Sequence, residues 1–149
     1  MESRVNDVVE SFESGFYCSQ AMLSTYCEDF GLDKETALKI SCGMAAGMAR
    51  LSSTCGAVTG AYMVISLKYG NCLPGDKEAL EKTFASIQEF DRQFVEKHGS
   101  TNCRELLGVD LRYGDKALAE ERVKALCSGF VKDAAEILET ILQQDERGL

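Results

Sequence analysis

Apolar residues recur every three or four positions along almost the whole chain, with polar residues between them. This period matches the α-helix, and no run of β-branched residues alternates with polar ones between Met1 and Leu149. The first helix is expected over residues 4–13, where Val5, Val8 and Phe12 share one face and Gly15 follows the end. The pattern therefore predicts an all-α fold.

The same spacing places further helices along the chain, with turn residues between them. They are expected at residues 18–30, 34–44, 55–69, 77–98, 102–107, 115–126 and 127–144. Asp33, Asp76 and Asp115 are suited to cap helices, because a carboxylate accepts hydrogen bonds from the unpaired N–H groups of a first turn. The helix over 55–69 is apolar all round, which is typical of a helix buried at the centre of a domain. We expect a compact single-domain helical bundle of about six to eight helices over residues 1–149.

Composition and charge narrow the classes of function. A net charge of -8, with no stripe of lysine and arginine, argues against nucleic-acid binding. The longest apolar stretch, 57–67, is shorter than the roughly 18 to 20 residues of a membrane span. Residues 1–7 are polar and lead into no apolar segment, so we expect no secretory signal and a cytoplasmic location. The acidic pairs Glu120–Glu121 and Asp145–Glu146 indicate solvated faces, and no phosphate-binding or dinucleotide motif predicts a nucleotide cofactor.

Seven cysteines are many for a chain without a secretory signal, because reducing compartments keep structural disulfides rare. Four of them fall at or near the start of an expected helix: Cys18, Cys55, Cys103 and Cys127. Helix N-termini carry unpaired N–H groups and a partial positive charge, so a thiolate is favoured there and its pKa is expected to be low. A thiolate is both the nucleophile of disulfide exchange and a ligand for zinc or iron, so the position leaves both chemistries open. The other three, Cys27, Cys42 and Cys72, are expected to be packing or surface residues.

Small residues follow Cys55 at the start of the central helix. Gly56 and Gly60, together with Ala57 and Ala61, form a strip along this helix. Such a strip lets another backbone, a cofactor or a second cysteine approach closely, so Gly56 and Gly60 are candidate cofactor-binding residues. Tight packing between helices is the alternative interpretation, because glycine inside a helix costs about 1 kcal/mol relative to alanine and packing is a common reason to retain it.

A motif and its surroundings carry a resemblance to a known family. Residues 55–60 read C-G-A-V-T-G, a C-G-A-x-x-G motif, which follows Y-C-S-Q-A at 17–21 and precedes N-C-R-E-L-L-G at 102–108. On these residues, and on Cys127 with the A-A-E-I-L-E that follows at 134–139, the chain resembles the C_GCAxxG_C_C family of redox-active proteins over most of its length. The resemblance implies that Cys18, Cys55, Cys103 and Cys127 are the four characteristic cysteines of that family.

Related sequences also lie beside haem-binding segments in split-Soret-type cytochromes, where an iron–sulfur centre is associated with the cysteine-bearing part. This chain has no C-x-x-C-H motif, so no covalent haem is expected.

Three hypotheses of function follow. The first is an iron–sulfur cluster or other thiolate-bound metal used for electron transfer, although the four cysteines are separated by 37, 48 and 24 residues and form no C-x-x-C pair. The second is thiol–disulfide chemistry without metal, with Cys55 as the attacking thiolate and another of the four as the resolving cysteine. The third is an acidic helical binding module whose cysteines are structural. The sequence leaves open a redox partner protein and a homo-oligomer, and the single histidine, His98, is explained by its place at a helix end.

Overall fold

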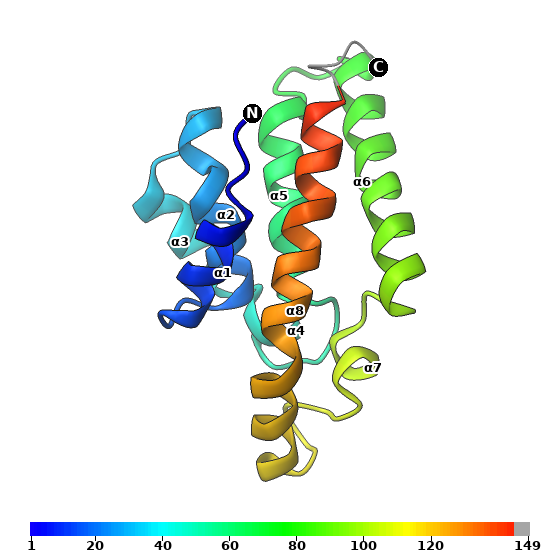
Figure 1. Cartoon of the computed structure of the whole chain (residues 1–149). Helices are drawn as coiled ribbons and strands as arrows, with labels where there is room; N and C mark the ends of the chain where they lie inside the picture. The colour runs from blue at the N-terminus through cyan, green and yellow to red at the C-terminus, as the bar shows by residue number, and fades with distance from the viewer. Residues whose placement is uncertain (145–149) are drawn as a thin grey trace.

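Helices account for nearly all of the secondary structure of the chain. The computed structural model describes residues 1–144; the predicted solvated pair Asp145–Glu146 and the end of the expected domain lie outside the described residues. The elements are α1 (Val5–Glu13), α2 (Cys18–Tyr26), the 3-10 turn η1 (Cys27–Phe30), α3 (Lys34–Cys42), α4 (Ala45–Ala49), α5 (Gly56–Tyr69), α6 (Lys77–His98), α7 (Cys103–Leu107) and α8 (Lys116–Gln143) (Figure 1). No strand occurs within this part of the chain, so the predicted all-α class is confirmed.

The expected caps set the helix boundaries. The side chain of Asp33 accepts a hydrogen bond from the Thr36 backbone N–H at 2.9 Å, and Asp115 accepts one from that of Leu118 at 2.8 Å. Each of these bonds satisfies a donor that the first turn of a helix otherwise leaves unpaired. At its other end α6 stops at Gly99, whose φ of +84° is a left-handed conformation that glycine adopts readily.

Helix α5 lies inside the bundle, as the sequence predicts. It packs against α2 on one side and against α6 and α8 on the other, and α1 packs against both α2 and α8 (Figure 1). Met22, Ile65, Phe90 and Leu138 come from four of these helices and are fully buried in one cluster of apolar side chains. No helix within residues 1–144 has both the length and the apolar character that crossing a membrane requires.

Helix α8 is continuous, which corrects the predicted division into helices at 115–126 and 127–144. The apolar stripe is unbroken, because Ala119, Val123, Phe130 and Ala134 succeed one another at helical spacing and all contribute to the core. Gly129 does not interrupt it, because glycine in a right-handed helix costs only about 1 kcal/mol. The first half of α8 projects beyond α1, α2, α5 and α6 and has α7 beside it (Figure 1).

The segment α4 is a turn of left-handed helix. Five consecutive residues, 46–50, have φ between +57° and +68°, and only one of them is glycine. The Arg50 N–H donates to the Ala46 carbonyl at 3.0 Å, which is the i to i-4 bond of an α-helix of the opposite hand. A left-handed residue with a side chain costs roughly 1–2 kcal/mol, so the surrounding structure must hold this turn in place. Part of that hold comes from Ser53, whose N–H donates to the Gly47 carbonyl at 2.9 Å.

Candidate functional site

The four cysteines that the sequence places near helix starts lie around one cavity. Cys18, Cys55, Cys103 and Cys127 come from α2, the N-cap of α5, α7 and α8, and all four line a cavity of about 870 Å³. The fold therefore brings together residues that the sequence separates by as many as 109 positions. Cys55 and Cys103 are buried, whereas Cys18 and Cys127 are half-buried.

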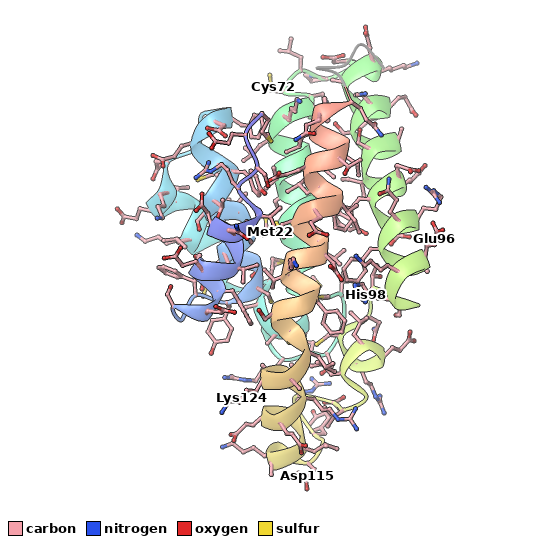
Figure 2. The ribbon with its side chains drawn as sticks, viewed as in Figure 1. Met22, Cys72, Glu96, His98, Asp115 and Lys124 are labelled. Carbon is pink, nitrogen blue, oxygen red and sulfur yellow. The ribbon has the colours of Figure 1, made fainter. Side chains whose placement is uncertain are left out.

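The three remaining cysteines lie away from this cavity. Cys27 is buried in the core, where its thiol donates to the Ser24 carbonyl at 3.5 Å, and Cys42 and Cys72 are exposed. Cys72 follows the end of α5 and lies at the end of the bundle opposite Asp115 and Lys124 (Figure 2). The structure thus separates the seven cysteines into the same two groups that helix position suggested.

Backbone hydrogen bonds fix two of the cavity cysteines relative to each other. The N–H of Cys55 donates to the Thr101 carbonyl at 2.8 Å, and the N–H of Cys103 donates to the Ser53 carbonyl at 2.6 Å. These bonds flank an isolated antiparallel bridge between Thr54 and Asn102. Cys55 and Cys103 are therefore held on two short segments joined like a fragment of β-sheet, although neither segment continues as a strand.

Cys127 does not start a helix, which corrects its expected position. It lies about three turns inside α8, whereas Cys18 and Cys103 are the first residues of their helices and Cys55 is an N-cap. Its backbone N–H group is within the helical hydrogen-bonding region, so the positive end of the helix dipole does not act on its sulfur. Cys127 reaches the cavity because the projecting half of α8 forms one wall of it.

The two candidate cofactor-binding glycines differ in their surroundings. A Cβ built on Gly56 would collide with the Cys18 sulfur and lie 3.1 Å from the Met44 carbonyl oxygen, so this glycine makes room for a second cysteine. Gly60 instead faces α2, where a Cβ would lie 2.8 Å from the Met22 Cβ, and it does not line the cavity. The contact of Gly60 with α2 is one of tight helix packing, and its predicted role in binding a cofactor stays a prediction.

A third glycine at the cavity was not singled out from the sequence. Gly47, in the left-handed turn, has a φ of +68°, and a Cβ on it would lie 2.7 Å from the Cys103 Cβ. The close approach of α4 to α7 thus depends on glycine for both its conformation and its small size. A glycine in a run of small residues is a weak signal, because the sequence does not show which side chain lies opposite.

Burial raises the pKa of the Cys55 thiol far above its usual value, which contradicts the expected low pKa. Loss of solvation is the largest cause, and the neighbouring charge of Cys18 adds to it. The backbone N–H groups of Ala57 and Val58, at the start of α5, act in the opposite direction. The helix N-terminus therefore favours the thiolate as expected, but desolvation of the buried sulfur outweighs it.

Burial and the charge of Cys18 also act on the thiols of Cys103 and Cys127. Burial, followed by the charge of Cys18, raises the pKa of Cys103 to about 11 and that of Cys127 to about 12. Cys18 is thus the common neighbour of the other three thiols. Cys55, Cys103 and Cys127 are therefore neutral thiols near pH 7, and charging one of them opposes charging the next.

Basic side chains surround the outer part of this cavity. Arg50, Arg112, Lys116 and Lys124 line it together with a single carboxylate, Glu120, and all five residues are exposed. We call these five residues the basic mouth. Its positive charge contrasts with the net charge of -8 of the chain. The basic mouth is not evident from the sequence because its residues come from three segments, although the spacing of Lys116, Glu120 and Lys124 does place them on one face of α8.

Ligands for a single metal ion are not assembled in the structure. Within residues 1–144, no group of three or more histidine, cysteine, aspartate or glutamate side chains is placed to hold one metal ion. His98 is engaged elsewhere, since its Nε2 lies 2.9 Å from the Asp133 carboxylate, between α6 and α8 (Figure 2). Of the histidine, cysteine, aspartate and glutamate side chains, the cavity lining contains the four cysteines and Glu120.

Comparison with known proteins identifies the family. Residues 16–141 match the family described as "Putative redox-active protein (C_GCAxxG_C_C)", a span that includes all four cavity cysteines. The chain belongs to this family. The resemblance noted in the sequence is thereby confirmed, and the family description supports a redox-active protein. Neither a curated protein nor a solved structure matches the chain.

Proposed function

We propose that this member of the C_GCAxxG_C_C family is an electron-transfer protein whose four cavity cysteines hold an iron–sulfur cluster. The observation that carries the proposal is that four thiols from four separate elements line one cavity of about 870 Å³. Such a cluster contains several iron atoms, so its ligands need not converge on a single point as zinc ligands do. The donor set fits this group better than a single ion, for which no three ligands are grouped within residues 1–144.

The protonation of the cavity also supports a bound metal centre. Three of the thiols are neutral near pH 7, so they are poor nucleophiles by themselves. Coordination to a metal deprotonates a thiol outright, and the positive charge of the metal removes the repulsion between neighbouring sulfurs. The basic mouth supplies further positive charge near a centre with four thiolate ligands. Cys18, Cys55, Cys103 and Cys127 would be the ligands, and the centre would supply one-electron chemistry.

Thiol–disulfide exchange is the second candidate, and the contact at Gly56 favours it. The Cys18 sulfur lies against Gly56, directly beside Cys55 in the chain, and Cys18 is half-buried on the cavity. A disulfide between Cys18 and Cys55 would form as two thiols lose two protons and two electrons to an oxidised partner disulfide, which becomes two thiols. In this scheme Cys18, rather than Cys55 as the sequence suggested, would attack first.

The cysteines and the apolar core also support a cellular compartment and a domain organisation for the protein. All seven cysteines are free in the structure, which suits a reducing compartment such as the cytoplasm. We infer a cytoplasmic protein in which residues 1–149 form one domain, because the apolar core of the described part is a single cluster.

Anaerobic purification followed by iron and acid-labile sulfide analysis tests the proposal. We expect stoichiometric iron and sulfide, with visible absorption that bleaches on reduction. Cys55→Ser should abolish this signal and leave the helical circular dichroism intact, whereas Cys72→Ser, at the opposite end of the bundle, should change neither. Zinc alone, or equal loss in the two variants, would contradict an iron–sulfur centre at the cavity.

Counting thiols separates the second candidate from the first. If the anaerobic protein is free of metal, mild oxidation should remove two thiols, and peptide mapping should join Cys18 to Cys55. A metal-free protein that keeps all seven thiols after oxidation would exclude both chemistries.

A further inference from the structure

The basic mouth contains positive charges that no ion pair among the described residues neutralises. Arg112 stacks on Tyr113, with its guanidinium carbon 4.2 Å from the ring centre. Among residues 1–144, no ion pair joins Arg50, Lys116 or Lys124 to a carboxylate, although Glu120 lies in the same lining. Four cations thus face one carboxylate at the entrance to a cavity of a strongly acidic chain. Such a concentration of charge at a concave surface attracts small anions.

The cavity changes character from its mouth to its cysteines. The basic side chains are exposed, whereas the rest of the lining includes the buried Cys55, Cys103 and Leu107 and the half-buried Leu111 and Val123, which carry no charge. A small molecule that contacts both the basic mouth and the buried part of the lining therefore needs negative charge at one end and a soft, uncharged group at the other. An inorganic dianion such as phosphate complements only the charge of the basic mouth, and a neutral thiol complements only the part of the lining that holds the cysteines.

We propose that the cavity binds a small thiol that carries carboxylate groups, with the carboxylates at the basic mouth and the sulfur toward the cysteines. The inference rests on the proposed redox role of this cavity and names the chemical class of its ligand. The local positive charge suits a small molecule better than an extended polyanion, because the rest of a chain with net charge -8 repels a long chain of phosphates. The proposal concerns binding only and includes no covalent step.

Lys124 is the residue at which the mouth can be tested most cleanly. It lies on the projecting half of α8 (Figure 2), is exposed, and forms no ion pair within the described residues, so its replacement breaks no salt bridge there. Lys132 provides a matched control, because it is an exposed lysine two turns further along the same helix that does not line the cavity. Lys124→Glu and Lys132→Glu make the same change in net charge.

Isothermal titration of the anaerobically purified full chain with three matched probes tests the proposal. Mercaptosuccinate carries both carboxylates and a thiol, succinate lacks the thiol, and thioglycerol lacks the carboxylates. We expect mercaptosuccinate to bind about tenfold more tightly than either of the others. Lys124→Glu should weaken its binding about fivefold, whereas Lys132→Glu should leave it within twofold of the original chain.

A second measurement locates the bound thiol. In the metal-free chain, where Cys18 is not a metal ligand, saturating mercaptosuccinate should slow the alkylation of Cys18 by iodoacetamide and leave that of the exposed Cys42 and Cys72 unchanged, as read by peptide mass spectrometry. Equal binding of succinate or thioglycerol, no binding of mercaptosuccinate, or equal effects of the two lysine variants would overturn the inference. Mercaptosuccinate binding to a protein found to lack iron would support the ligand class and contradict only the iron–sulfur centre, so the two failures are distinguishable.

Discussion

Replacing Gly56 with alanine tests whether the Cys18 sulfur really occupies the space that this glycine leaves. The added methyl group would collide with that sulfur and would also lie 3.1 Å from the Met44 carbonyl oxygen and 3.3 Å from the Ser19 nitrogen. The last two atoms belong to the backbone, so they cannot turn aside as the end of a flexible side chain can. Either the first turn of α5 must shift, or Cys18 must leave its place in the cavity.

The size of the effect follows from two opposing contributions. Overpacking of a close contact costs about 1–3 kcal/mol of the free energy of unfolding. The loss of glycine's freedom in the unfolded chain returns about 0.4–1 kcal/mol, and no positive φ stands against alanine at this position. The difference between these ranges runs from about 0 to 2.6 kcal/mol, and its midpoint predicts that Gly56→Ala destabilises the metal-free protein by about 1.3 kcal/mol.

Two other helical glycines provide the controls. Gly129 on α8 has no atom within 4 Å of an added Cβ, so Gly129→Ala should stabilise the protein by about 0.5–1 kcal/mol. Gly60→Ala would place its methyl 2.8 Å from the Met22 Cβ and should destabilise the protein, but Gly60 does not line the cavity. Only Gly56→Ala should therefore combine lower stability with altered chemistry of the cavity cysteines.

Urea denaturation followed by circular dichroism gives the free energies, and the same preparations give the alkylation rate of Cys18 and the iron content. Gly56→Ala should raise the alkylation rate of Cys18 and lower the iron content, whereas Gly60→Ala should leave both close to those of the original chain. A Gly56→Ala protein as stable as Gly129→Ala, with unchanged Cys18 reactivity, would refute the close approach of α2 to the start of α5.

Three further predictions concern other parts of the molecule. Ala49→Gly should stabilise the protein by up to about 1 kcal/mol in urea denaturation, because Ala49 is exposed and has a φ of +57°; destabilisation would contradict the left-handed turn. The metal-free protein should lose stability as the pH rises from about 8.5, the pKa of a cysteine in the unfolded chain, toward the pKa values of about 11 for Cys103 and 12 for Cys127. The reason is that the unfolded chain releases these protons at a lower pH than the folded chain does. Denaturation at constant ionic strength should show a smaller loss of stability in Cys103→Ala, and an equal loss in that variant would contradict the prediction. Tyr26→Phe should cost about 1–3 kcal/mol in the same assay, because the buried Glu139 carboxylate accepts from the Tyr26 hydroxyl at 2.5 Å and would lose that donor; an unchanged midpoint would show that water replaces it.

The sequence predicts most of the helices because their determinants are local. Apolar spacing locates their buried faces, and residues such as Asp33, Asp115 and Gly99 mark where the chain enters or leaves a helix. The predicted division of α8 between residues 126 and 127 was wrong, because the helix continues through this point. Phe130 and its neighbours anchor it in the core, which is a tertiary effect that the sequence does not show.

The sequence predicts the cysteines of the cavity but not the other segments that line it. Helix position and the family motif selected Cys18, Cys55 and Cys103 by properties that lie within a few residues of each. The left-handed turn has no such signal, because its conformation depends on contacts with the segments around Ser53 and Cys103. The pKa direction was also wrong, since the sequence shows that a thiol lies at a helix start but not how completely it is buried.

The wide spacing of the four cysteines along the chain has a consequence for the lifetime of the protein. A centre bonded to all four sulfurs would close loops of 37, 48 and 24 residues and so tie together segments from α2 to α8. Closing such loops removes freedom from the unfolded chain, and a group that binds only the folded state adds its binding free energy to the stability. A loaded protein would resist proteolysis that an empty one does not, so its abundance in a cell would follow the supply of the bound group.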